Sequence, residues 1–280
     1  MAAKRKLMLL GTMSNVGKST IAAGLCRYFS NVGCQTVPFK ALNISAKAAV
    51  LPDGGKIGIG QAVQASAARA VAEGRMNPIL IQPENGGVQY YLRGQPSPLR
   101  SGSGSTACAR KEALAAFREL EAEYDAVVLE GSGSCCELNL LEKDTANGWM
   151  AAVTETNAVL VADVERGGVF AQVCGTLALL PPEYRKRIRG IIINKFHGEP
   201  ELFRSSVRIL EERTGVPVVG VLPWKEPGLP EEDGTEAKTV RADTLSSPKL
   251  QARYDALAEW LHAYLDMEAV FKISETLGRL

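Results

Sequence analysis

A loop rich in glycine and ending in lysine and serine is the part of this sequence best suited to bind phosphate. Residues 11–20 read GTMSNVGKST, follow an apolar run at residues 6–10 and precede a helical pattern. A loop between a strand and a helix turns backbone N–H groups and the helix N-terminus toward an anion. In such a loop Lys18 reaches the terminal phosphates, and the Ser19 hydroxyl binds Mg²⁺. The sequence therefore predicts a nucleoside triphosphate site.

The spacing of the two glycines indicates a particular subclass of phosphate loop. Gly11 and Gly17 are separated by five residues, whereas the common pattern has four. An incidental glycine turn with a stray lysine is the alternative, but the flanking strand and helix are those that the mechanism requires. We expect the nucleotide to contact residues throughout the loop, namely Gly11, Thr12, Ser14, Asn15, Val16, Gly17, Lys18, Ser19 and Thr20.

Acidic residues follow two other apolar runs. Glu130 comes after residues 126–129 and opens the turn Glu-Gly-Ser-Gly-Ser, and a carboxylate at the end of a parallel strand suits Mg²⁺. A solvated glutamate that opens a turn is the alternative. Asp163 and Arg166 lie in the segment ADVERGG before another helical pattern, where they could hold an anionic group or orient a substrate. Helix capping by Asp163 is equally compatible with this pattern.

A second lysine ends an apolar run that is expected to lie next to the first strand in the sheet, near the phosphate loop. Lys40 follows residues 36–39. Such a cation could stabilise a transferring phosphoryl group or bind an acidic substrate. An exposed lysine at a strand end is common, so the position also fits a residue without a function.

Composition and charge argue against several classes of partner. The chain has 32 basic and 31 acidic residues in 280, without a block of one sign, so we expect neither nucleic acid nor an anionic membrane as a partner. The apolar stretch near the N-terminus is too short for a secretory signal, and no stretch is long enough to span a bilayer. Six cysteines without zinc-ligand spacing and only two histidines indicate the reducing cytoplasm.

Short apolar runs alternate with amphipathic segments along the chain, which predicts an α/β fold. We expect buried parallel strands at residues 6–10, 36–39, 126–129, 158–162, 190–194 and 218–221. We expect helices at residues 19–31, 58–73, 106–123, 169–180 and 200–214. This order predicts a doubly wound, mostly parallel sheet with ligands at the carboxyl ends of its strands. Residues 83–105 are expected to form an excursion with a mobile loop.

Further motifs follow the phosphate loop in a fixed order. They are PFKALNIS at residues 38–45, PDGG at 52–55, MNP at 76–78, LEGSGS at 129–134, ELNL at 137–140, ADVERGGVFAQ at 162–172 and INKF at 193–196. Together they resemble the synthetase domain of cobyric acid synthase from about residue 6 to residue 224. Cobyrinic acid a,c-diamide synthase and dethiobiotin synthetase are wider relatives, and they share the longer phosphate loop and the Glu-Gly turn.

The resemblance implies an ATP-dependent and Mg²⁺-dependent amide-forming ligase of cobalamin biosynthesis. ATP would phosphorylate a carboxylate of a corrinoid precursor, and ammonia would displace the acyl phosphate, as in conversion of cobyrinic acid a,c-diamide to cobyric acid. Lys18, Lys40 and Asp163 are the expected catalytic residues. Ser19, Asp53 and Glu130 are the expected metal ligands. Asn194 and Pro223 would contact the adenine base, whereas Lys40, Asn43, Ser45 and Arg166 would face the acid substrate.

This chain differs from the family pattern at three positions and in its length. Leu42, Lys47 and Gln82 stand where the family has glutamine, asparagine and lysine, in segments expected to approach the acid, so the identity of the corrinoid stays open. Family members usually carry a C-terminal glutaminase domain, whereas this chain ends at residue 280. Cys135 and Cys136 have no histidine nearby in the sequence and are interpreted as small residues beside the Glu130 turn. Ammonia would come from the free pool or from a separate glutaminase subunit.

The expected organisation has three parts: a synthetase domain at residues 1–224, a polar linker at 225–249 and a helical tail at 250–280. The oligomeric state, including a homodimer, is left open. Two other functions also remain. An ATPase switch of the MinD or ParA type would have a signature lysine where this chain has Met13, and a non-catalytic relative would not need the intact Gly-Lys-Ser and Glu-Gly motifs.

Overall fold

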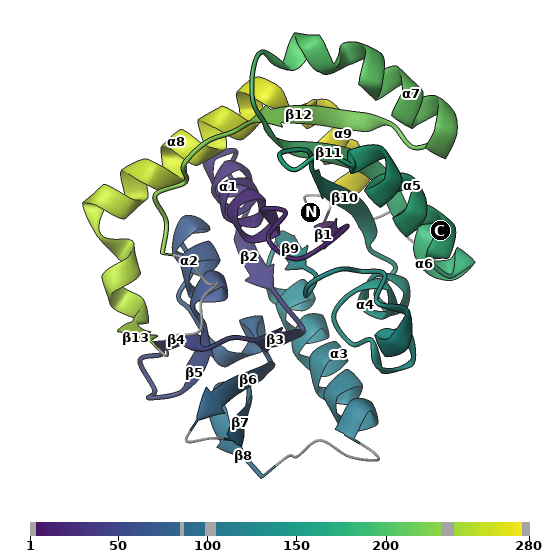
Figure 1. The fold of residues 1–280 in the computed structure, drawn as a ribbon. Coiled ribbons are helices and arrows are strands. Elements are labelled where there is room, and N and C mark those ends of the chain that lie inside the picture. Colours follow the sequence, from purple (N-terminus) through teal and green to yellow (C-terminus); the bar gives the residue numbers. More distant parts are fainter. Residues whose placement is uncertain (1–3, 85–86, 99–104, 231–237, 276–280) are drawn as a thin grey trace.

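A sheet of six parallel strands forms the centre of the molecule (Figure 1). The computed structural model describes residues 4–84, 87–98, 105–230 and 238–275. The strand order is β12-β11-β10-β1-β9-β2. The strands are β1 Arg5–Gly11, β2 Thr36–Phe39, β9 Ala126–Glu130, β10 Asn157–Asp163, β11 Ile188–Phe196 and β12 Val218–Pro223. All six predicted strands are therefore present, and the predicted doubly wound sheet is confirmed.

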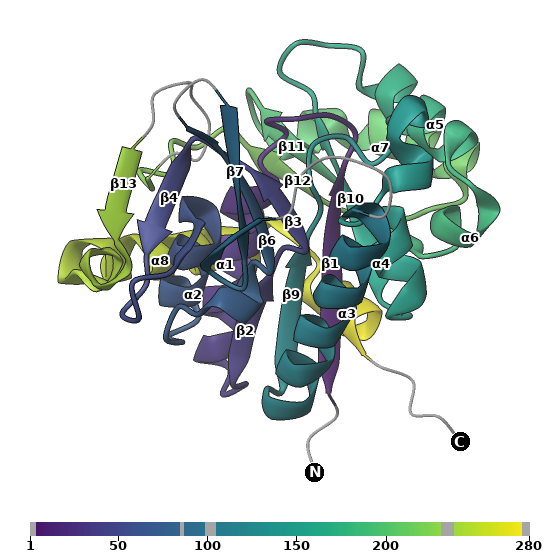
Figure 2. The same cartoon turned by 90° about the horizontal axis from the view of Figure 1, so that it is seen from below.

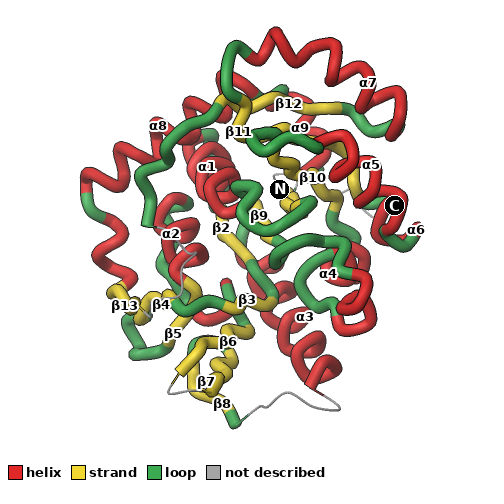
Figure 3. Tube along the Cα trace, in the orientation of Figure 1, coloured by secondary structure: helices red, strands yellow, loops and turns green. Residues whose placement is uncertain are grey.

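Two small sheets lie to one side of the large sheet, as the yellow tubes of Figure 3 show. One has the order β13-β4-β5, with β13 at Lys238–Arg241, β4 at Lys47–Val50 and β5 at Lys56–Gly58. The other has the order β3-β6-β7-β8, with β3 at Leu42–Ile44, β6 at Ile79–Glu84, β7 at Gly87–Leu92 and β8 at Gln95–Ser97. The sequence analysis did not predict these short strands.

Helices cover both faces of the large sheet, as Figure 2 shows. The α-helices are α1 Lys18–Asn31, α2 Ile59–Ala67, α3 Ser105–Glu123, α4 Gly148–Val153, α5 Val169–Leu179, α6 Pro182–Arg185, α7 Arg204–Thr214, α8 Pro248–Tyr264 and α9 Met267–Ser274. The 3₁₀ segments among the described residues are η1 Gly74–Met76, η2 Leu138–Lys143, η3 Pro200–Phe203 and η4 Ala242–Ser246. Helices α1, α2, α8 and α9 pack on one face, and α3, α4, α5 and α7 pack on the other.

Strand β1 divides the core into two clusters because its side chains alternate between the faces. Leu7 and Leu9 belong to the cluster under α1 and α8, whereas Met8 and Leu10 belong to the cluster under α3 and α5. Strand β1 lies between β9 and β10, which come much later in the chain. From β1 the chain runs to β2 at one edge of the sheet, returns to β9 beside β1, and then adds β10, β11 and β12 on the other side. Ligands bind in such sheets at the carboxyl ends of the strands where the order reverses, which here is beside β1.

Three expected segments differ from the structure. Helix α2 ends at Ala67, six residues before the expected end, and Arg69 then adopts a positive φ of 58°. Within residues 83–105 the structure has β7, β8 and the end of β6, while residues 85–86 and 99–104, on which part of the expected excursion and mobile loop falls, lie outside the described part. The expected polar linker contains β13, which pairs with β4. Backbone hydrogen bonding to a distant strand can order polar segments that lack hydrophobic periodicity.

The described C-terminal helices share the core of the sheet. Helix α8 lies along α1, where Leu257 and Leu261 pack against the Cα of Gly24. The buried Arg27 of α1 lies over the ring of Tyr254 and donates to Gln251. The described residues 248–275 therefore pack against the large sheet and its helices. A domain boundary at residue 224 stays a prediction. No described helix is both long enough and apolar enough to cross a membrane.

Substitution of Gly220 should test how tightly the C-terminal segment packs on the sheet. A Cβ at Gly220 of β12 would meet the backbone of Tyr264 and Leu265 at the end of α8. We expect Gly220→Ala to lower the free energy of unfolding by about 1–3 kcal/mol, as overpacked sites do. Urea denaturation followed by circular dichroism measures the change.

Gly175 offers a matched control inside helix α5. A Cβ there would meet no atom within 4 Å, so Gly175→Ala should raise the free energy of unfolding by up to about 1 kcal/mol through helix propensity. Equal stability of the two variants would contradict the close packing of β12 against the segment that joins α8 to α9.

Candidate active site

The phosphate loop connects the carboxyl end of β1 to the first turn of α1. Gly17 has a φ of +95°, a conformation that a residue with a Cβ rarely adopts, and a Cβ there would also strike the Asn194 amide. A Cβ on Gly11 would lie 2.7 Å from Lys18 Nζ. Lys18 Nζ donates to the carbonyl oxygens of Met13 at 3.3 Å and Gly133 at 2.8 Å. Gly17 is therefore required for this loop conformation, whereas a side chain at Gly11 would crowd the end of Lys18.

The Glu130 carboxylate is the meeting point of three elements. Ser19 Oγ of α1 donates to Oε1 at 2.7 Å, and Lys40 Nζ donates to the same oxygen at 3.0 Å. Gln64 Nε2 of α2 donates to Oε2 at 2.5 Å. The register of the sheet explains the convergence, because Glu130 lies beside Leu9 of β1 and Lys40 directly follows β2, the other neighbour of β9. The structure thus brings together Ser19, Lys40 and Glu130, which the sequence analysis singled out separately.

Glu130 is 1% exposed, so its charge depends on these partners. Burial by itself raises the pKa of the Glu130 carboxyl, but the Lys40 ammonium, the hydrogen bonds from Ser19 and Gln64 and the charge of Lys18 together hold the pKa below its usual value. The carboxylate is therefore ionised at neutral pH. An ionised carboxylate beside a serine hydroxyl, at the edge of a phosphate loop, is a donor set that fits Mg²⁺.

A polar cleft of about 620 Å³ runs from the phosphate loop past Glu130. Ten of the residues predicted to bind nucleotide, metal or substrate line it: Ser14, Asn15, Gly17, Lys18, Ser19, Thr20, Lys40, Asn43, Glu130 and Asn194. Its charged lining residues are the lysines at 18, 40, 195 and 225 and the glutamates at 130 and 226. This excess of positive charge would attract a polyphosphate.

The opposite end of the cleft carries residues expected near the base. Asn194 Nδ2 donates to the Val16 carbonyl oxygen at 2.8 Å, which ties β11 to the phosphate loop. Trp224 lines the cleft and its ring stacks on His197 with centroids 6.0 Å apart. Pro223 ends β12 one residue earlier and does not itself belong to the lining. An aromatic ring and a tethered amide are suited to stack on and hydrogen-bond to a nucleobase.

Several predicted residues lie outside this cleft. Asp163 Oδ2 accepts from Lys195 at 2.8 Å, and its Oδ1 accepts from the Glu165 backbone at 2.7 Å. Arg166 is exposed on the same turn before α5. The structure therefore does not bring the Asp163 carboxylate or Arg166 to the lining of the cleft, and the Asp163 contacts resemble those of a turn and an ion pair.

Three more predicted residues serve local structure. Asp53 lies in the turn between β4 and β5, where its Oδ1 accepts from Gly55 N at 2.9 Å, so the structure does not bring it to Glu130. Ser45 Oγ exchanges hydrogen bonds with the Lys47 backbone. The Thr12 hydroxyl donates to Gln172 Oε1 at 3.1 Å. None of the three side chains belongs to the lining of the cleft.

Sequence reasoning missed three polar residues of this site. Gln64 holds Glu130, and Gln61, one helical turn earlier, accepts from Asn43 at 2.9 Å. Lys195 Nζ donates to the Asn15 carbonyl oxygen at 2.7 Å. Gln64 Oε1 and Gln61 Nε2 are buried without a hydrogen-bond partner among the described residues. Two glutamines three positions apart in an otherwise apolar helical segment were the available signal, because a buried helix face seldom carries amides without a partner.

The cysteines next to this site have the environment of unreactive thiols. Burial, followed by the neighbouring Cys136, raises the pKa of Cys135 to about 12, and burial also raises the pKa of Cys136. His197 contacts Glu165 and Trp224, while His262 stacks on Tyr28. Both histidines of the chain therefore pack elsewhere and do not pair with these thiols.

Comparison with known proteins also indicates a nucleotide-binding domain. The family model described as the CobQ/CobB/MinD/ParA nucleotide binding domain matches residues 7–233. A cobyric acid synthase of Chlorobium phaeobacteroides is 47% identical over 224 residues, which are 79% of this chain and 45% of that protein. A probable cobyric acid synthase of Methanosphaerula palustris is 47% identical over 242 residues, 85% of this chain and 50% of that protein. The chain thus spans about half the length of these curated relatives.

Among solved structures, the MinC:MinD cell division protein complex of Aquifex aeolicus matches with a TM-score of 0.45 and 16% identity, covering 92% of this chain and 96% of that chain. The family model covers most of the chain, including most of β1, the phosphate loop and the Glu130 turn. The chain therefore belongs to the CobQ/CobB/MinD/ParA nucleotide-binding domain family.

Proposed function

We propose that this protein uses ATP to convert a carboxylate of a corrinoid precursor into an amide. The observation that carries the proposal is the convergence of Ser19, Lys40 and Gln64 on the ionised Glu130, beside the phosphate-loop lysine. The proposed reaction must bring together two anions, the γ-phosphate of ATP and the attacking carboxylate. Two lysines and a bound metal ion would reduce the repulsion between them. Similarity of 47% identity to cobyric acid synthases supports the corrinoid as the substrate class.

The proposed chemistry has two steps. A carboxylate oxygen of the acid attacks the γ-phosphorus of ATP, the bond between that phosphorus and the bridging oxygen breaks, and ADP leaves with the electron pair. Ammonia then attacks the carbonyl carbon of the acyl phosphate, loses a proton and expels inorganic phosphate, which leaves the amide. Phosphorylation is needed because a carboxylate oxygen is a poor leaving group, and a phosphate is a much better one.

Residues of the cleft have separate tasks in this scheme. Lys18 would stabilise the terminal phosphates, and Lys40 would stabilise the transferring group or the attacking carboxylate. Ser19 and Glu130 would hold Mg²⁺, which when bound supplies positive charge to the phosphate oxygens. Asn194 and Trp224 would position the base. Asn43, held by Gln61, would face the acid.

An ATPase switch is the second function that the family name covers, since that name includes MinD and ParA. Such a switch would hydrolyse ATP without regard to a carboxylic acid. ATP turnover that depends on both cobyrinic acid a,c-diamide and ammonia would support the ligase, whereas turnover indifferent to both would support the switch.

Removal of the phosphate-loop lysine should abolish ATP turnover. Lys18 is held by backbone carbonyl groups at the edge of the cleft, so Lys18→Ala removes a charge from the reacting phosphates and little core packing. We expect ATP turnover to fall at least about 100-fold, with a circular dichroism spectrum like that of the wild type. Lys186→Ala, at an exposed position after α6, should leave turnover unchanged. Wild-type turnover in folded Lys18→Ala would rule out this role.

Neutralising Glu130 should raise the Mg²⁺ concentration that activity requires. Glu130→Gln keeps the shape and removes the metal-binding charge. It also leaves the Lys40 ammonium buried without its ion pair, so we expect a loss of several kcal/mol in stability as well. Mg²⁺ titration of ATP turnover, at a temperature where the variant is folded, measures the first effect. Asp53→Asn is the comparison, because its turn position predicts an unchanged Mg²⁺ requirement, and equal shifts in both variants would contradict the assignment of Glu130.

The protonation state of the cysteines predicts which compound supplies the amide nitrogen. A buried thiol with a pKa of about 12 is protonated at neutral pH and is a poor nucleophile. Ammonium chloride should therefore support amide formation by the purified chain, with a rate that rises with pH as NH₃ replaces NH₄⁺. Glutamine should support none unless a separate glutaminase is added. Release of glutamate from glutamine that disappears in Cys135→Ser or Cys136→Ser would show that a thiol is catalytic after all.

A further inference from the structure

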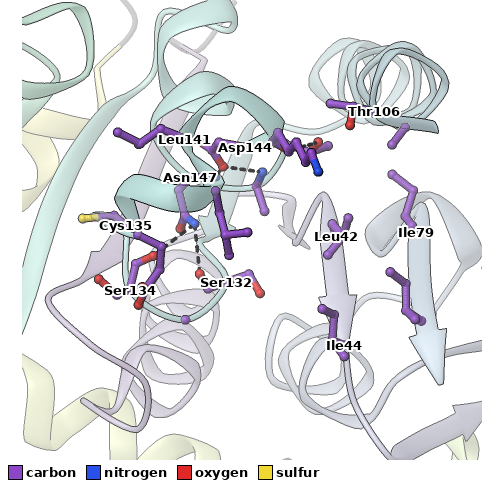
Figure 4. A pocket seen from close by; sticks show the side chains of 18 of the residues that line it. Leu42, Ile44, Ile79, Thr106, Ser132, Ser134, Cys135, Leu141, Asp144 and Asn147 are labelled. Atoms are coloured by element: carbon purple, nitrogen blue, oxygen red, sulfur yellow. Dashed lines mark hydrogen bonds between the residues drawn. The ribbon is translucent and has the colours of Figure 1, made fainter. Parts of the chain in front are cut away.

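A second pocket, of about 500 Å³, lies next to the phosphate cleft (Figure 4). One wall is the small sheet β3-β6-β7-β8, and the opposite wall is the Ser132–Cys135 segment together with η2 and the start of α4. Figure 4 shows Leu42, Ile44 and Ile79 on the first wall and Ser132, Ser134 and Asn147 on the second. The proposed reaction assigned no role to this pocket.

The sheet wall is apolar for a structural reason. Leu42 and Ile44 alternate with Asn43 along β3, so they point to the same face. They lie in register beside Ile79 and Ile81 of β6, and Ile81 in turn faces Tyr90 of β7. All five side chains line the pocket, so one face of this sheet presents a continuous apolar surface to it.

The two pockets are joined at the phosphate loop. Ser14, Ile44, Ser132 and Gly133 line both of them. Away from this junction, β3 forms a wall between the two pockets, because Leu42 lines only the apolar pocket and Asn43 lines only the polar cleft. A molecule seated in the apolar pocket could therefore extend a polar group around the Ser132–Gly133 turn toward Lys18, which is hydrogen-bonded to the Gly133 carbonyl oxygen.

We propose that this pocket holds the apolar body of the acid substrate, with its carboxylate directed into the polar cleft. The inference rests on the proposed function and names its substrate class, a carboxylic acid carried on an extended apolar ring system such as a corrinoid. Ile44 is 64% exposed and Leu140 of η2 is 51% exposed, although both line the pocket. Contact with an apolar ring would remove this surface from water. Leu42, Ile44 and Leu140 are then the residues that determine which acid binds.

The chain contains a matched control for each of the two exposed residues. Leu138 belongs to the same 3₁₀ segment as Leu140 and is 54% exposed, and Val88 of β7 is 57% exposed. Neither lines the pocket. Aspartate at any of these four exposed positions should leave the core intact, so differences between variants report on the ligand.

The experiment measures equilibrium binding of cobyrinic acid a,c-diamide by dialysis to the wild type and to Ile44→Asp, Leu140→Asp, Val88→Asp and Leu138→Asp. We expect affinity to fall by about tenfold or more in Ile44→Asp and Leu140→Asp, because a buried carboxylate faces the apolar ring. Affinity should stay within about twofold of the wild type in the two controls. Binding of Mg²⁺ and ATP should change little in Leu140→Asp and in the two controls, because none of these three residues lines the phosphate cleft, and this excludes a general defect of that cleft.

The outcomes test the pocket assignment separately from the proposed reaction. Equal corrinoid affinity in all four variants, or no corrinoid binding by the wild type, would overturn the pocket assignment. Amide formation from the corrinoid, ATP and ammonia is assayed separately with the wild type. If amide forms but the pocket variants bind normally, the proposed function stands and this inference is lost. If binding depends on the pocket but no amide forms, the inference stands and the reaction is wrong.

Discussion

The arrangement of the site depends on one buried negative charge, that of Glu130. A carboxylate that is 1% exposed would be too costly to keep ionised alone, and the Lys40 ammonium at 3.0 Å provides the charge that stabilises it. Hydrogen bonds from Ser19 to Oε1 and from Gln64 to Oε2 stabilise the charge further. The same contacts fix the relative positions of α1, α2 and the ends of β2 and β9. The group that is best placed to bind a cation thus also holds together the elements that surround it.

This constraint explains why the lysines of the cleft differ in character. Lys40 is 5% exposed and forms an ion pair with Glu130 at 3.0 Å. Lys18 donates to the carbonyl oxygens of Met13 and Gly133, and its charge also helps to lower the pKa of Glu130. A divalent metal at Glu130 would therefore change the electrostatic environment of both lysines.

The sequence predicted the sheet and the centre of the site because both depend on local patterns. Runs of valine, isoleucine and leucine identified all six parallel strands. The strand before Lys40 was expected beside β1, which was wrong, because β9 lies between β1 and β2. It is the pairing of β2 with β9 that places Lys40 beside Glu130. Gln64 escaped notice because its role depends on how α2 crosses the end of the sheet, which no local pattern records. Asp163 was expected to act in catalysis, which stays a prediction. The partner of its carboxylate, Lys195, lies 32 positions away and was not singled out in the sequence. The short strands β3, β4, β5 and β13 contain too few residues to show a period of two.

The central position of β1 has a consequence for how the chain acquires its structure during synthesis. Residues 5–11 emerge first, yet their partners in the sheet are residues 126–130 and 157–161. Arg5 also donates to the carbonyl oxygen of Phe271 in α9, so contacts of the first strand span almost the whole described chain. Folding that depends on such distant contacts is slow compared with helix formation. During synthesis, β1 must wait for residues 126–130 before it can pair with β9, and for residues 157–161 before it can pair with β10.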